Sequence, residues 1–348
     1  MNLRIRQVDL VADRQELLSV LQRNLQDVPH ESRLSWMYLG NPAGFARSWF
    51  LCDADADGSA VGVTSLFPRA VWLDGKAEVC GQVGDFGVDA RFRSLGPALM
   101  LQRATFEPVL ENAIAFCYDC PPHELGMAMF YRLGLEENCR MQPFVKPLRA
   151  DRHLQRLLGS TAGRVASRMA NPVLRLNPRP LNPCHGVEFA LHQGDFDQEF
   201  SAVDEAVPAC GSIRNRRSAD DLNWRFRRDP VRQFEVLTAR RAGELLAYVI
   251  FTIVEEDALI FDLFGRDLKC VGTHLLQALT DMLYGRPLQT LRAVLTCDDL
   301  VGRIFGEAGF SPRGHSTRVV AFGGAKFGCE DALLHTAHWQ FQHSDVVA

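Results

Sequence analysis

The sequence predicts a mixed α/β (α+β) protein made of two similar units in tandem, each a twisted sheet flanked by helices. Three observations lead to this fold class. The 348 residues exceed the roughly 100 to 200 that one ordinary domain needs. The composition, 47% apolar and 23% charged, is that of a globular chain able to bury large cores. Finally, a pattern of strands and helices runs to about residue 148 and starts again at Gly186.

The elements of the first unit, residues 1–149, follow from hydrophobic periodicity. The alternating segment LRIRQVDLV predicts a strand, and the following DRQELLSVLQRNL predicts an amphipathic helix. Several apolar strands come next, separated by the turn signals Asp57-Gly58 and Asp74-Gly75. The first unit is therefore expected to fold as a mixed α/β domain.

A helical and proline-rich linker is predicted over residues 150–185. It begins with an Arg-rich amphipathic stretch, RHLQRLLGSTAGRVASRMA. The second unit, residues 186–348, then repeats the order of the first, with a strand VEFALH, a helix FDQEFSAVDEAV and the strands QFEVLTAR and ELLAYVIFTIV. Four prolines in the linker are expected to prevent the helix from continuing: Pro172, Pro178, Pro180 and Pro183.

Short matches between the two units predict duplication of one fold. Trp36 is followed by Asn41-Pro42, and Trp224 is followed at the same spacing by Asp229-Pro230. Each unit also ends in a helix that closes on a glycine and an apolar residue, MAMFYRLGL and VGRIFGEAGF. We interpret the aromatic element as the packing of a helix end against a sheet rather than as a ligand contact.

Charge and hydropathy argue against several classes of function. The 38 basic and 42 acidic residues give a formal charge of -4, so no general attraction to nucleic acid or to an anionic membrane is expected. The longest apolar run, residues 245–254, is shorter than the roughly 18 to 20 residues of a membrane-spanning helix. Charges near the N-terminus are unlike a signal peptide. The sequence thus predicts a cytoplasmic protein.

The cysteine and histidine patterns predict no metal site. The ten cysteines are scattered, mostly within apolar segments, which favours buried thiols over a disulfide framework. Cys117 and Cys120 form a single CxxC without a second pair at zinc-finger spacing. We interpret the polar tail that carries four possible ligands as a solvated end: His335, His338, His343 and Asp345.

The most informative stretch is CGQVGDFGVDARFRSLGPALMLQRA, residues 80–104. An apolar strand ends at Val88, a short polar loop follows, and RSLGPA opens an apolar-periodic helix. The small residues Gly96 and Ala98 let a ligand approach the backbone. The first-turn amides and the helix dipole then form an anion site suited to a pyrophosphate.

This stretch resembles the acyl-CoA loop of the GNAT (Gcn5-related N-acetyltransferase-like) superfamily, in which a valine is followed by an Arg or Gln and by xxGxG or xxGxA. VDARFRSLGPA fits the pattern, and a strand AIAFCYD and a helix ending FYRLGL follow in the family's order. The two-copy arrangement is similar to bacterial exopolysaccharide-linked acyltransferases. The resemblance implies mostly antiparallel sheets and an acyl-CoA co-substrate, most simply acetyl-CoA. It assigns the pantetheine arm to Phe86, Gly87 and Val88 and the pyrophosphate to Arg93, Ser94, Leu95, Gly96 and Ala98.

Three positions differ from the family pattern. The carboxylate that some members carry on the strand falls on Gln82, and strand alternation puts the nearest carboxylate, Asp85, on the opposite face unless a bulge intervenes. The tyrosine that protonates the thiolate falls on Phe130, which leaves the neighbouring Tyr131, water or an inactive copy as alternatives. His123 stands where many members have an asparagine that contacts the CoA arm. It is a candidate base or ligand contact, or an ordinary surface residue.

The second unit lacks a good copy of this loop. KCVGTH, residues 269–274, stands against RSLGPA, and His274 would crowd a phosphate. We therefore expect this unit to lack a CoA site and to shape the substrate cleft. A basic cluster with interleaved aromatics either grips an acidic substrate or nucleic acid, or forms a solvated face paired with Asp220, Asp221 and Asp229, which we favour. Its arginines are Arg214, Arg216, Arg217, Arg225, Arg227 and Arg228.

The resemblance implies an acyl-CoA-dependent N-acyltransferase in which an amine attacks the thioester directly, in the cleft between the two units. The acceptor would be a small-molecule amine such as an amino sugar or an amino acid, without a role for nucleic acid or metal. One alternative is a non-catalytic acyl-CoA-binding or scaffold protein, favoured by Phe130 and Gln82. Another is a FemAB-like aminoacyl transferase or an acyltransferase that uses carrier-protein thioesters. The sequence does not indicate the oligomeric state.

Overall fold

The computed structural model describes residues 2–25, 30–121, 124–175, 184–296, 300–324, 334–335 and 338–346. The strands of the first half are β1 (Leu3–Gln7), β2 (Arg47–Asp53), β3 (Ser59–Leu73), β4 (Lys76–Val88), β5 (Phe116–Asp119) and β6 (Cys139–Pro147). Its helices are α1 (Arg14–Asn24), α2 (His30–Arg33), the π-helical turn η1 (Leu34–Leu39), the 3₁₀ turn η2 (Ala90–Phe92), α3 (Leu95–Ala104), α4 (Glu107–Leu110) and α5 (Glu124–Arg132).

Two helices, α6 (Asp151–Leu158) and α7 (Ser160–Arg175), connect the halves. The strands of the second half are β7 (Val187–Leu191), β8 (Ser212–Asn215), β9 (Glu235–Arg241), β10 (Glu244–Val254), β11 (Asp257–Gly265), β12 (Thr290–Thr296), β13 (Ser311–Pro312), β14 (Thr317–Gly323) and β15 (His338–Trp339). Its helices are α8 (Gln198–Ala206), α9 (Ala219–Leu222), the π-helical turn η3 (Asn223–Arg227), α10 (Leu268–Leu283), α11 (Leu300–Glu307) and α13 (His343–Val346).

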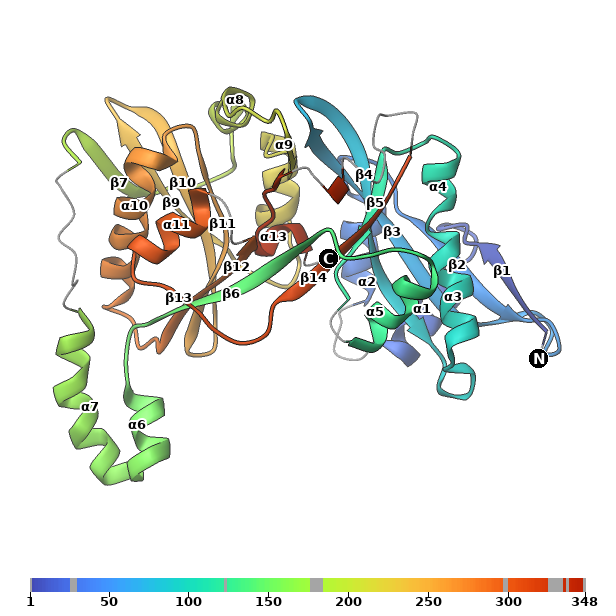
Figure 1. The fold of residues 1–348 in the computed structure, drawn as a ribbon, viewed down its shortest axis with the longest axis horizontal. Coiled ribbons are helices and arrows are strands. Elements are labelled where there is room, and N and C mark those ends of the chain that lie inside the picture. Colours follow the sequence, from blue (N-terminus) through green and yellow to red (C-terminus); the bar gives the residue numbers. More distant parts are fainter. Residues whose placement is uncertain are drawn as a thin grey trace.

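One long sheet runs through both halves in the order β1-β2-β3-β4-β5-β14-β6-β12-β11-β10-β9-β7 (Figure 1). Among the pairs described, β4–β5, β11–β12 and β8–β15 are parallel and the others are antiparallel. The predicted mixed α/β class with mostly antiparallel strands is thus confirmed. None of the helices in the described residues is long and apolar enough to cross a membrane.

Helices cover both faces of the first half of the sheet because successive strand side chains point to opposite sides. Phe50 of β2 packs into a cluster with Leu17 and Leu21 of α1. Its neighbour Leu51 packs into a different cluster with Leu101 of α3. The side of the sheet that carries α3 is called the α3 face below, and the side that carries α1 is called the α1 face.

The two halves exchange strands. β6, the last strand of the first half, pairs along its length with β12 of the second half. In return, β14 of the second half pairs with β5 of the first. β6 and β14 therefore make the sheet continuous across the two halves, and local sequence does not determine which strand edge each of them pairs with.

Reciprocal contacts also join the halves at the two tryptophans. Trp36 donates its indole N–H to the carbonyl of Trp224 at 2.7 Å, and Trp224 donates to the carbonyl of Trp36 at 3.0 Å. The two rings lie 5.5 Å apart, and each tryptophan is in a π-helical turn. Reciprocal contacts of this kind, in which each of two residues makes the same contact to the other, are typical of a two-fold relation.

Two segments differ from the sequence-based expectation. Pro172 lies inside α7, which continues to Arg175, although proline was expected to end the helix. The C-terminal tail is solvated only in part: His335 and His338 are exposed as predicted, whereas Asp345 is buried and burial lowers the pKa of His343 to about 4. Local polarity does not reveal this burial, since the partners of the tail come from distant strands. Asn215 of β8, for example, donates to the Asp345 carboxylate at 2.8 Å.

Candidate functional site

The centre of the candidate site is the gap that opens between the parallel strands β4 and β5. They are paired at Gly81 with Cys117 and at Gln82 with Tyr118. Beyond this point β4 runs on to Val88 beside β3, whereas Asp119 of β5 pairs with β14. The edge of β4 that follows Gln82 is therefore not paired with β5. A ligand that carries amide groups can add to such an edge by hydrogen bonding.

Beyond the end of β4, the chain turns into α3 and forms an open corner. Ser94 precedes the helix in extended conformation, and the amides of Leu95 and Gly96 lie in the first turn, where a helix has no acceptor of its own. A Cβ built on Gly96 would meet nothing within 4 Å. The corner is thus open toward the space in front of the helix N-terminus, which favours anions.

A groove of about 300 Å³ lies against this corner. Arg93 also donates to the carbonyl of Val88 at 2.9 Å, which fixes the turn between β4 and α3. Asn24 at the end of α1 forms the far wall, and a Cβ on Gly87 would lie 2.6 Å from that of Asn24, so only glycine allows this contact. Six of the eight residues assigned to acyl-CoA line the groove: Phe86, Gly87, Val88, Arg93, Ser94 and Ala98.

A β-bulge in β4 brings Asp85 to the α1 face. Two residues of β4 oppose one of β3 between the pairs Val63–Gly87 and Ser65–Gly84, and Asp85 has a positive φ of 47°. Strand alternation alone would place Asp85 opposite Gln82, whereas the bulge returns it to the same face.

On the α1 face, Asp85 belongs to a buried ion pair. Its carboxylate accepts from Arg33 at 2.7 and 3.1 Å and from the hydroxyl of Tyr38 at 2.6 Å. Burial alone would lower the pKa of Arg33, but the charge and hydrogen bonds of Asp85 outweigh it and raise the pKa. Burial and then Asp85 hold the pKa of Tyr38 well above its ordinary value, so Tyr38 stays a neutral donor. The Asp85 carboxylate is thus bound by two side chains, Arg33 and Tyr38.

We expect Arg33→Ala to lower the free energy of unfolding by about 3–5 kcal/mol, because Asp85 would stay buried without its cation. Urea unfolding at neutral pH measures the change. Arg14→Ala is the matched control: Arg14 pairs with the exposed Glu31 at 2.6 Å, and its loss should cost less than about 1 kcal/mol. An equal effect of the two substitutions would contradict a structural role for the Asp85 pair.

The remaining predicted catalytic residues have different surroundings. Phe130 is buried in a cluster with Phe86 and Val320 on the α3 face, at the position where a tyrosine was expected. Tyr131 is 53% exposed to solvent. His123 lies outside the described residues. The structure therefore brings Phe130, rather than Tyr131, next to the residues that line the groove.

Asp119, at the end of β5, is a titratable group of the site that the sequence reasoning missed. It pairs across the sheet with Val320 and therefore shares the α3 face with Phe130 and Phe86. Burial raises its pKa to about 7, although the backbone amide of Cys120 donates to it and lowers the pKa. A carboxyl group poised near neutrality at a gap between strands is a candidate for proton transfer. The only sequence signal was a charged residue ending an apolar strand.

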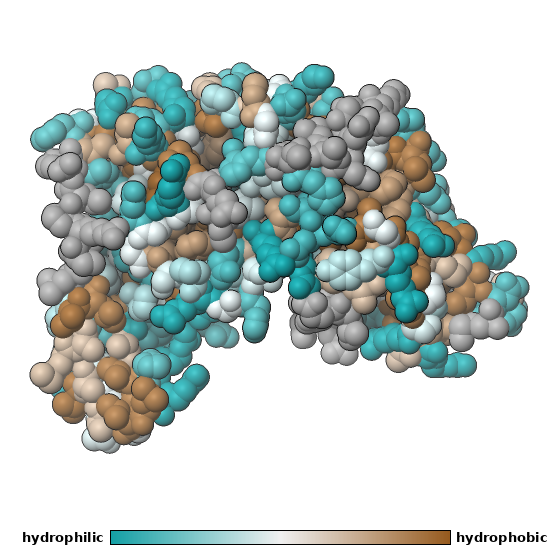
Figure 2. Space-filling view, in the orientation of Figure 1, coloured by the Kyte–Doolittle hydropathy of each residue, from teal (hydrophilic) through white to brown (hydrophobic). Residues whose placement is uncertain are grey.

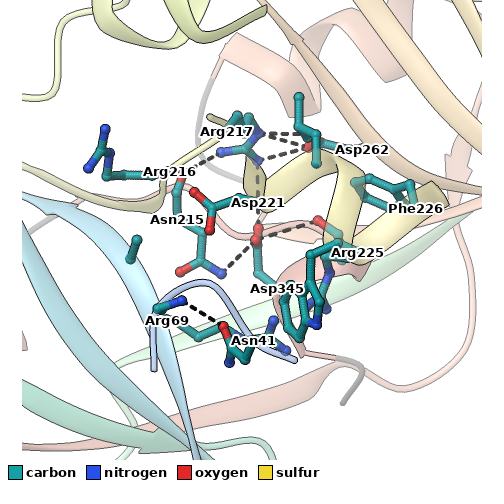
Figure 3. A pocket seen from close by; sticks show the side chains of 15 residues that line it. Asn41, Arg69, Asn215, Arg216, Arg217, Asp221, Arg225, Phe226, Asp262 and Asp345 are labelled. Carbon is teal, nitrogen blue, oxygen red and sulfur yellow. Dashed lines mark hydrogen bonds and ion pairs between the residues drawn. The ribbon is translucent and has the colours of Figure 1, made fainter. Parts of the chain in front are cut away.

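A small polar cavity of about 30 Å³ lies between the halves (Figure 3). Arg69 of β3 lines it and donates to the amide oxygen of Gln82 at 2.6 and 3.0 Å, which connects the cavity to the point where β4 and β5 separate. Burial, followed by repulsion from Arg69, lowers the pKa of Arg225 to about 9. The cavity is thus lined by two arginine side chains, those of Arg69 and Arg225.

The predicted basic cluster is not a single solvated face, because Arg214 and Arg217 are buried while Arg228 is exposed and the other three are half-buried. Arg214 binds Asp204, and Arg217 binds Asp262 at 2.8 Å. Both carboxylates differ from the partners expected from sequence. Asp221 instead accepts from Ser218 at 2.5 Å, and burial raises its pKa. Arg214 and Arg217 are bound to carboxylates inside the second half, so this segment is not arranged as an open nucleic-acid surface.

In the second half, the corner between β11 and α10 also borders a pocket, of about 310 Å³, whose lining includes Phe264, Gly265 and Lys269. At Gly272, the residue that the sequence sets against Gly96, a Cβ would lie 2.9 Å from Ile304 of α11, but Gly272 lies about one turn inside α10 rather than at its start. The strands β11 and β12 also separate beyond Ile260 and Ala293, and the C-terminal segment enters this gap. There the side chain of Gln342 both accepts from and donates to the backbone of Leu263 at 2.8 Å. These contacts occupy the strand edge that a ligand would need.

Cysteines and possible metal ligands add no further centre in the described part of the chain. Cys117 and Cys120 are free thiols, and burial raises the pKa of both. No group of three or more His, Cys, Asp or Glu residues in the described ranges could hold a metal ion.

The site thus combines a mixed sheet, a gap between two parallel strands and an open helix N-terminus beside that gap. No protein-family model and no curated protein matches the sequence. Solved structures do match. A probable N-acyltransferase from Enterococcus faecalis V583 aligns with a TM-score of 0.64 and 11% identity, over 93% of this chain and 73% of that one.

Two further structures extend the comparison. A GCN5-related N-acetyltransferase from Anabaena variabilis ATCC 29413 has a TM-score of 0.63 and 12% identity, over 91% of this chain and 72% of that one. Saccharomyces cerevisiae N-myristoyltransferase with bound myristoyl-CoA has a TM-score of 0.57 and 12% identity, over 92% and 82%. The chain thus has the fold of the GCN5-related N-acetyltransferases, as the loop at residues 88–98 predicted.

Proposed function

We propose that this protein is an acyl-CoA-dependent N-acyltransferase. The observation that carries the proposal is the continuity between the open corner at Gly96, the groove along residues 86–88 and the point beyond Gln82 where β4 leaves β5. The names of its structural neighbours, which are N-acyltransferases, support the same chemistry. Acetyl-CoA is the simplest donor, and we propose that residues 1–149 and 186–348 are two copies of one fold, joined by 150–185.

The dimensions of β4 suit the co-substrate. The diphosphate would bind the amides of Leu95 and Gly96, with Arg93 and Ser94 beside it. From Val88 back to Gln82 the strand spans roughly 20 Å, the reach of an extended pantetheine arm. A cofactor bound at the corner would therefore place its thioester near the last β4–β5 pair.

We propose that Asp119 protonates the leaving thiolate in place of the missing tyrosine hydroxyl. It shares the α3 face with Phe130, which has no proton to donate. With a pKa of about 7, Asp119 is partly protonated at neutral pH and can give its proton to a thiolate. Asp85, held by Arg33 and Tyr38, would act as a positioning residue rather than as a base.

The amine end of the acceptor would reach the thioester at the cavity between the halves, whose volume of about 30 Å³ admits an amino group but not a whole amino acid. Its lining combines Arg69 and Arg225 with the carboxylate of Asp221. Burial raises the pKa of Asp221, which improves it as the base for an incoming ammonium group. Arginines beside the cavity favour an acceptor that also carries a negative group, which suits an amino acid better than a plain amine.

We expect Tyr131→Phe to leave turnover within about twofold of the original value, because the Tyr131 side chain is 53% exposed and Asp119 is the proposed acid. Steady-state rates with acetyl-CoA and an accepted amine provide the measurement. Phe130→Tyr is the matched substitution on the buried side of the same helix and should keep or raise the rate. A large loss in Tyr131→Phe alone would instead assign the acid to that hydroxyl.

Two measurements test the proposed function together. A thermal-shift series with CoA, acetyl-CoA and longer acyl-CoAs should raise the melting temperature, since a ligand that binds only the native state stabilises it. Release of free CoA thiol should then depend on added amine across a panel of amino acids and amino sugars. Failure of every acyl-CoA to shift the melting temperature would contradict the proposal.

A non-catalytic acyl-CoA-binding role is the second candidate function. It is favoured by Phe130 at the position of the expected tyrosine and by Gln82, whose amide oxygen is already bound by Arg69. The same two measurements separate the candidates. Tight acyl-CoA binding without thiol release over the whole amine panel would support the binder.

A further inference from the structure

The helices α6 and α7 form an arm that projects from the body of the protein, at the lower left of Figure 1. The arm is a built structure rather than a loose connection. A Cβ on Gly163 would collide with the backbone of Gln155, so the two helices cross in close contact. Asn171 accepts from the amide of Ala150 at 2.8 Å and donates to Asp151 at 2.9 Å, which closes the base of the arm.

An apolar surface covers the outer side of this arm. Val165, Met169 and Val173 follow one another at four-residue spacing on α7 and form one stripe. Figure 2 shows apolar side chains gathered on the lobe at the lower left, where the arm lies in Figure 1. The exposed fractions are 65% for Leu157 and 52% for Leu158 at the tip, then 59% for Val165, 76% for Met169 and 63% for Val173.

Arginines flank the apolar stripe. Arg164 and Arg168 each precede a stripe residue by one position, which places them about 100° around the helix, beside the stripe rather than within it. Residues 149–175 carry six arginines and one aspartate, a formal charge of six minus one, or +5, whereas the whole chain is at -4. The arm therefore combines a net positive charge with exposed apolar side chains.

A groove of about 600 Å³ at the base of the arm has the same chemistry. Its walls combine apolar side chains, Val145, Pro147 and Leu174, with basic ones. Arg152 reaches Asp257 at 3.4 Å at the surface. The basic lining residues are Arg149, Arg152, His153, Arg156 and Arg313.

We propose that the α6–α7 arm docks the protein on the surface of a bilayer that contains anionic phospholipids. The stripe and the two leucines at the tip would enter the boundary between headgroups and acyl chains, and the flanking arginines would bind phosphate groups. The groove at the base would receive a headgroup. This inference concerns residues outside the acyl-transfer site and is independent of the proposed function.

The charges and shape favour a bilayer over other partners. A second copy would bring one +5 arm against another, which costs electrostatic free energy. RNA would use the arginines but has no contact to offer to the exposed leucines at the tip. Because the arm stands out from the body, it can reach a flat surface without collision of the two halves (Figure 1).

The test uses the full chain and co-sedimentation with vesicles of phosphatidylcholine, with and without phosphatidylglycerol. We expect sedimentation only with the anionic vesicles and a decrease as salt is raised. Met169→Asp, and Arg164→Glu combined with Arg168→Glu, should each weaken the partition at least about tenfold. The matched controls are Val11→Asp, at a residue 82% exposed on the body, and Arg303→Glu on α11, and both should bind as the original chain does.

Other results would overturn the proposal. These are absence of binding to anionic vesicles, binding that the arm variants leave unchanged, or release of the vesicle-bound protein by RNA. A dimer in solution that Met169→Asp converts to a monomer, without vesicle binding, would assign the surface to a second copy. All these residues are exposed, so the variants should keep the circular dichroism of the original protein.

Discussion

Gly96→Glu should abolish CoA binding, with affinity weakened at least about 100-fold, a loss of about 2.7 kcal/mol. The new carboxylate would occupy the space before the first turn of α3 and repel a diphosphate bound to the amides there. The fold should survive, because a side chain at this position extends into space with nothing within 4 Å. Calorimetric titration with CoA, and the loss of the thermal shift that CoA causes, measure the effect.

A matched glycine is available in the second half. Gly306 also lies in a helix with nothing within 4 Å of an added Cβ, so Gly306→Glu adds the same charge and bulk far from the corner. It should bind CoA as the original chain does. Undiminished affinity in a folded Gly96→Glu variant would reject the corner as the diphosphate site.

Asp119→Asn is expected to lower turnover by about 100-fold or more, the usual contribution of a positioned acid. In the original protein the rate should fall as pH rises through about 7, because Asp119 loses the proton that the thiolate needs. The variant should show a low rate without this pH dependence. Rates measured from pH 5.5 to 9 with saturating acetyl-CoA test the shape of the profile.

Rescue and stability distinguish this role from a structural one. Adding Phe130→Tyr to Asp119→Asn should restore part of the lost turnover, since Phe130 shares the α3 face with Asp119. The raised pKa means that the folded state favours the protonated acid, so the stability that Asp119 contributes is present at low pH and lost as pH rises through about 7. The asparagine variant should therefore melt several degrees higher than the original chain at pH 8. A slow variant that also unfolds easily would point to damage instead.

Much of the site could be predicted from the sequence because it is local. The residues that line the groove come mostly from one continuous stretch, 86–98, in which a strand, a turn and a helix start follow one another. Hydrophobic periodicity and small residues are sufficient to place such a corner. The absence of a CoA site in the second half stays a prediction: Gly272 lies against Ile304, but a pocket of about 310 Å³ borders the start of α10.

Features that depend on distant partners could not be predicted in this way. The bulge that turns Asp85 toward Arg33 depends on the register of β4 against β3. The raised pKa of Asp119 depends on what buries it, and α5 and β14 lie beyond it in the chain. The exchange of β6 and β14 between the halves likewise depends on which strand edges lie close together in the fold. Local sequence does not determine this pairing.

The sequence by itself determined the class of fold and the turn from strand to helix at residues 88–98, because strand periodicity, small residues and a helix start occupy consecutive positions. Only the tertiary structure decided which side chains reach the gap between β4 and β5, where the C-terminal segment lies and which arginines are paired. The physical reason is that burial, charge pairing and strand register depend on groups that lie far apart in the chain. These interactions contribute free energy only when folding brings the groups together.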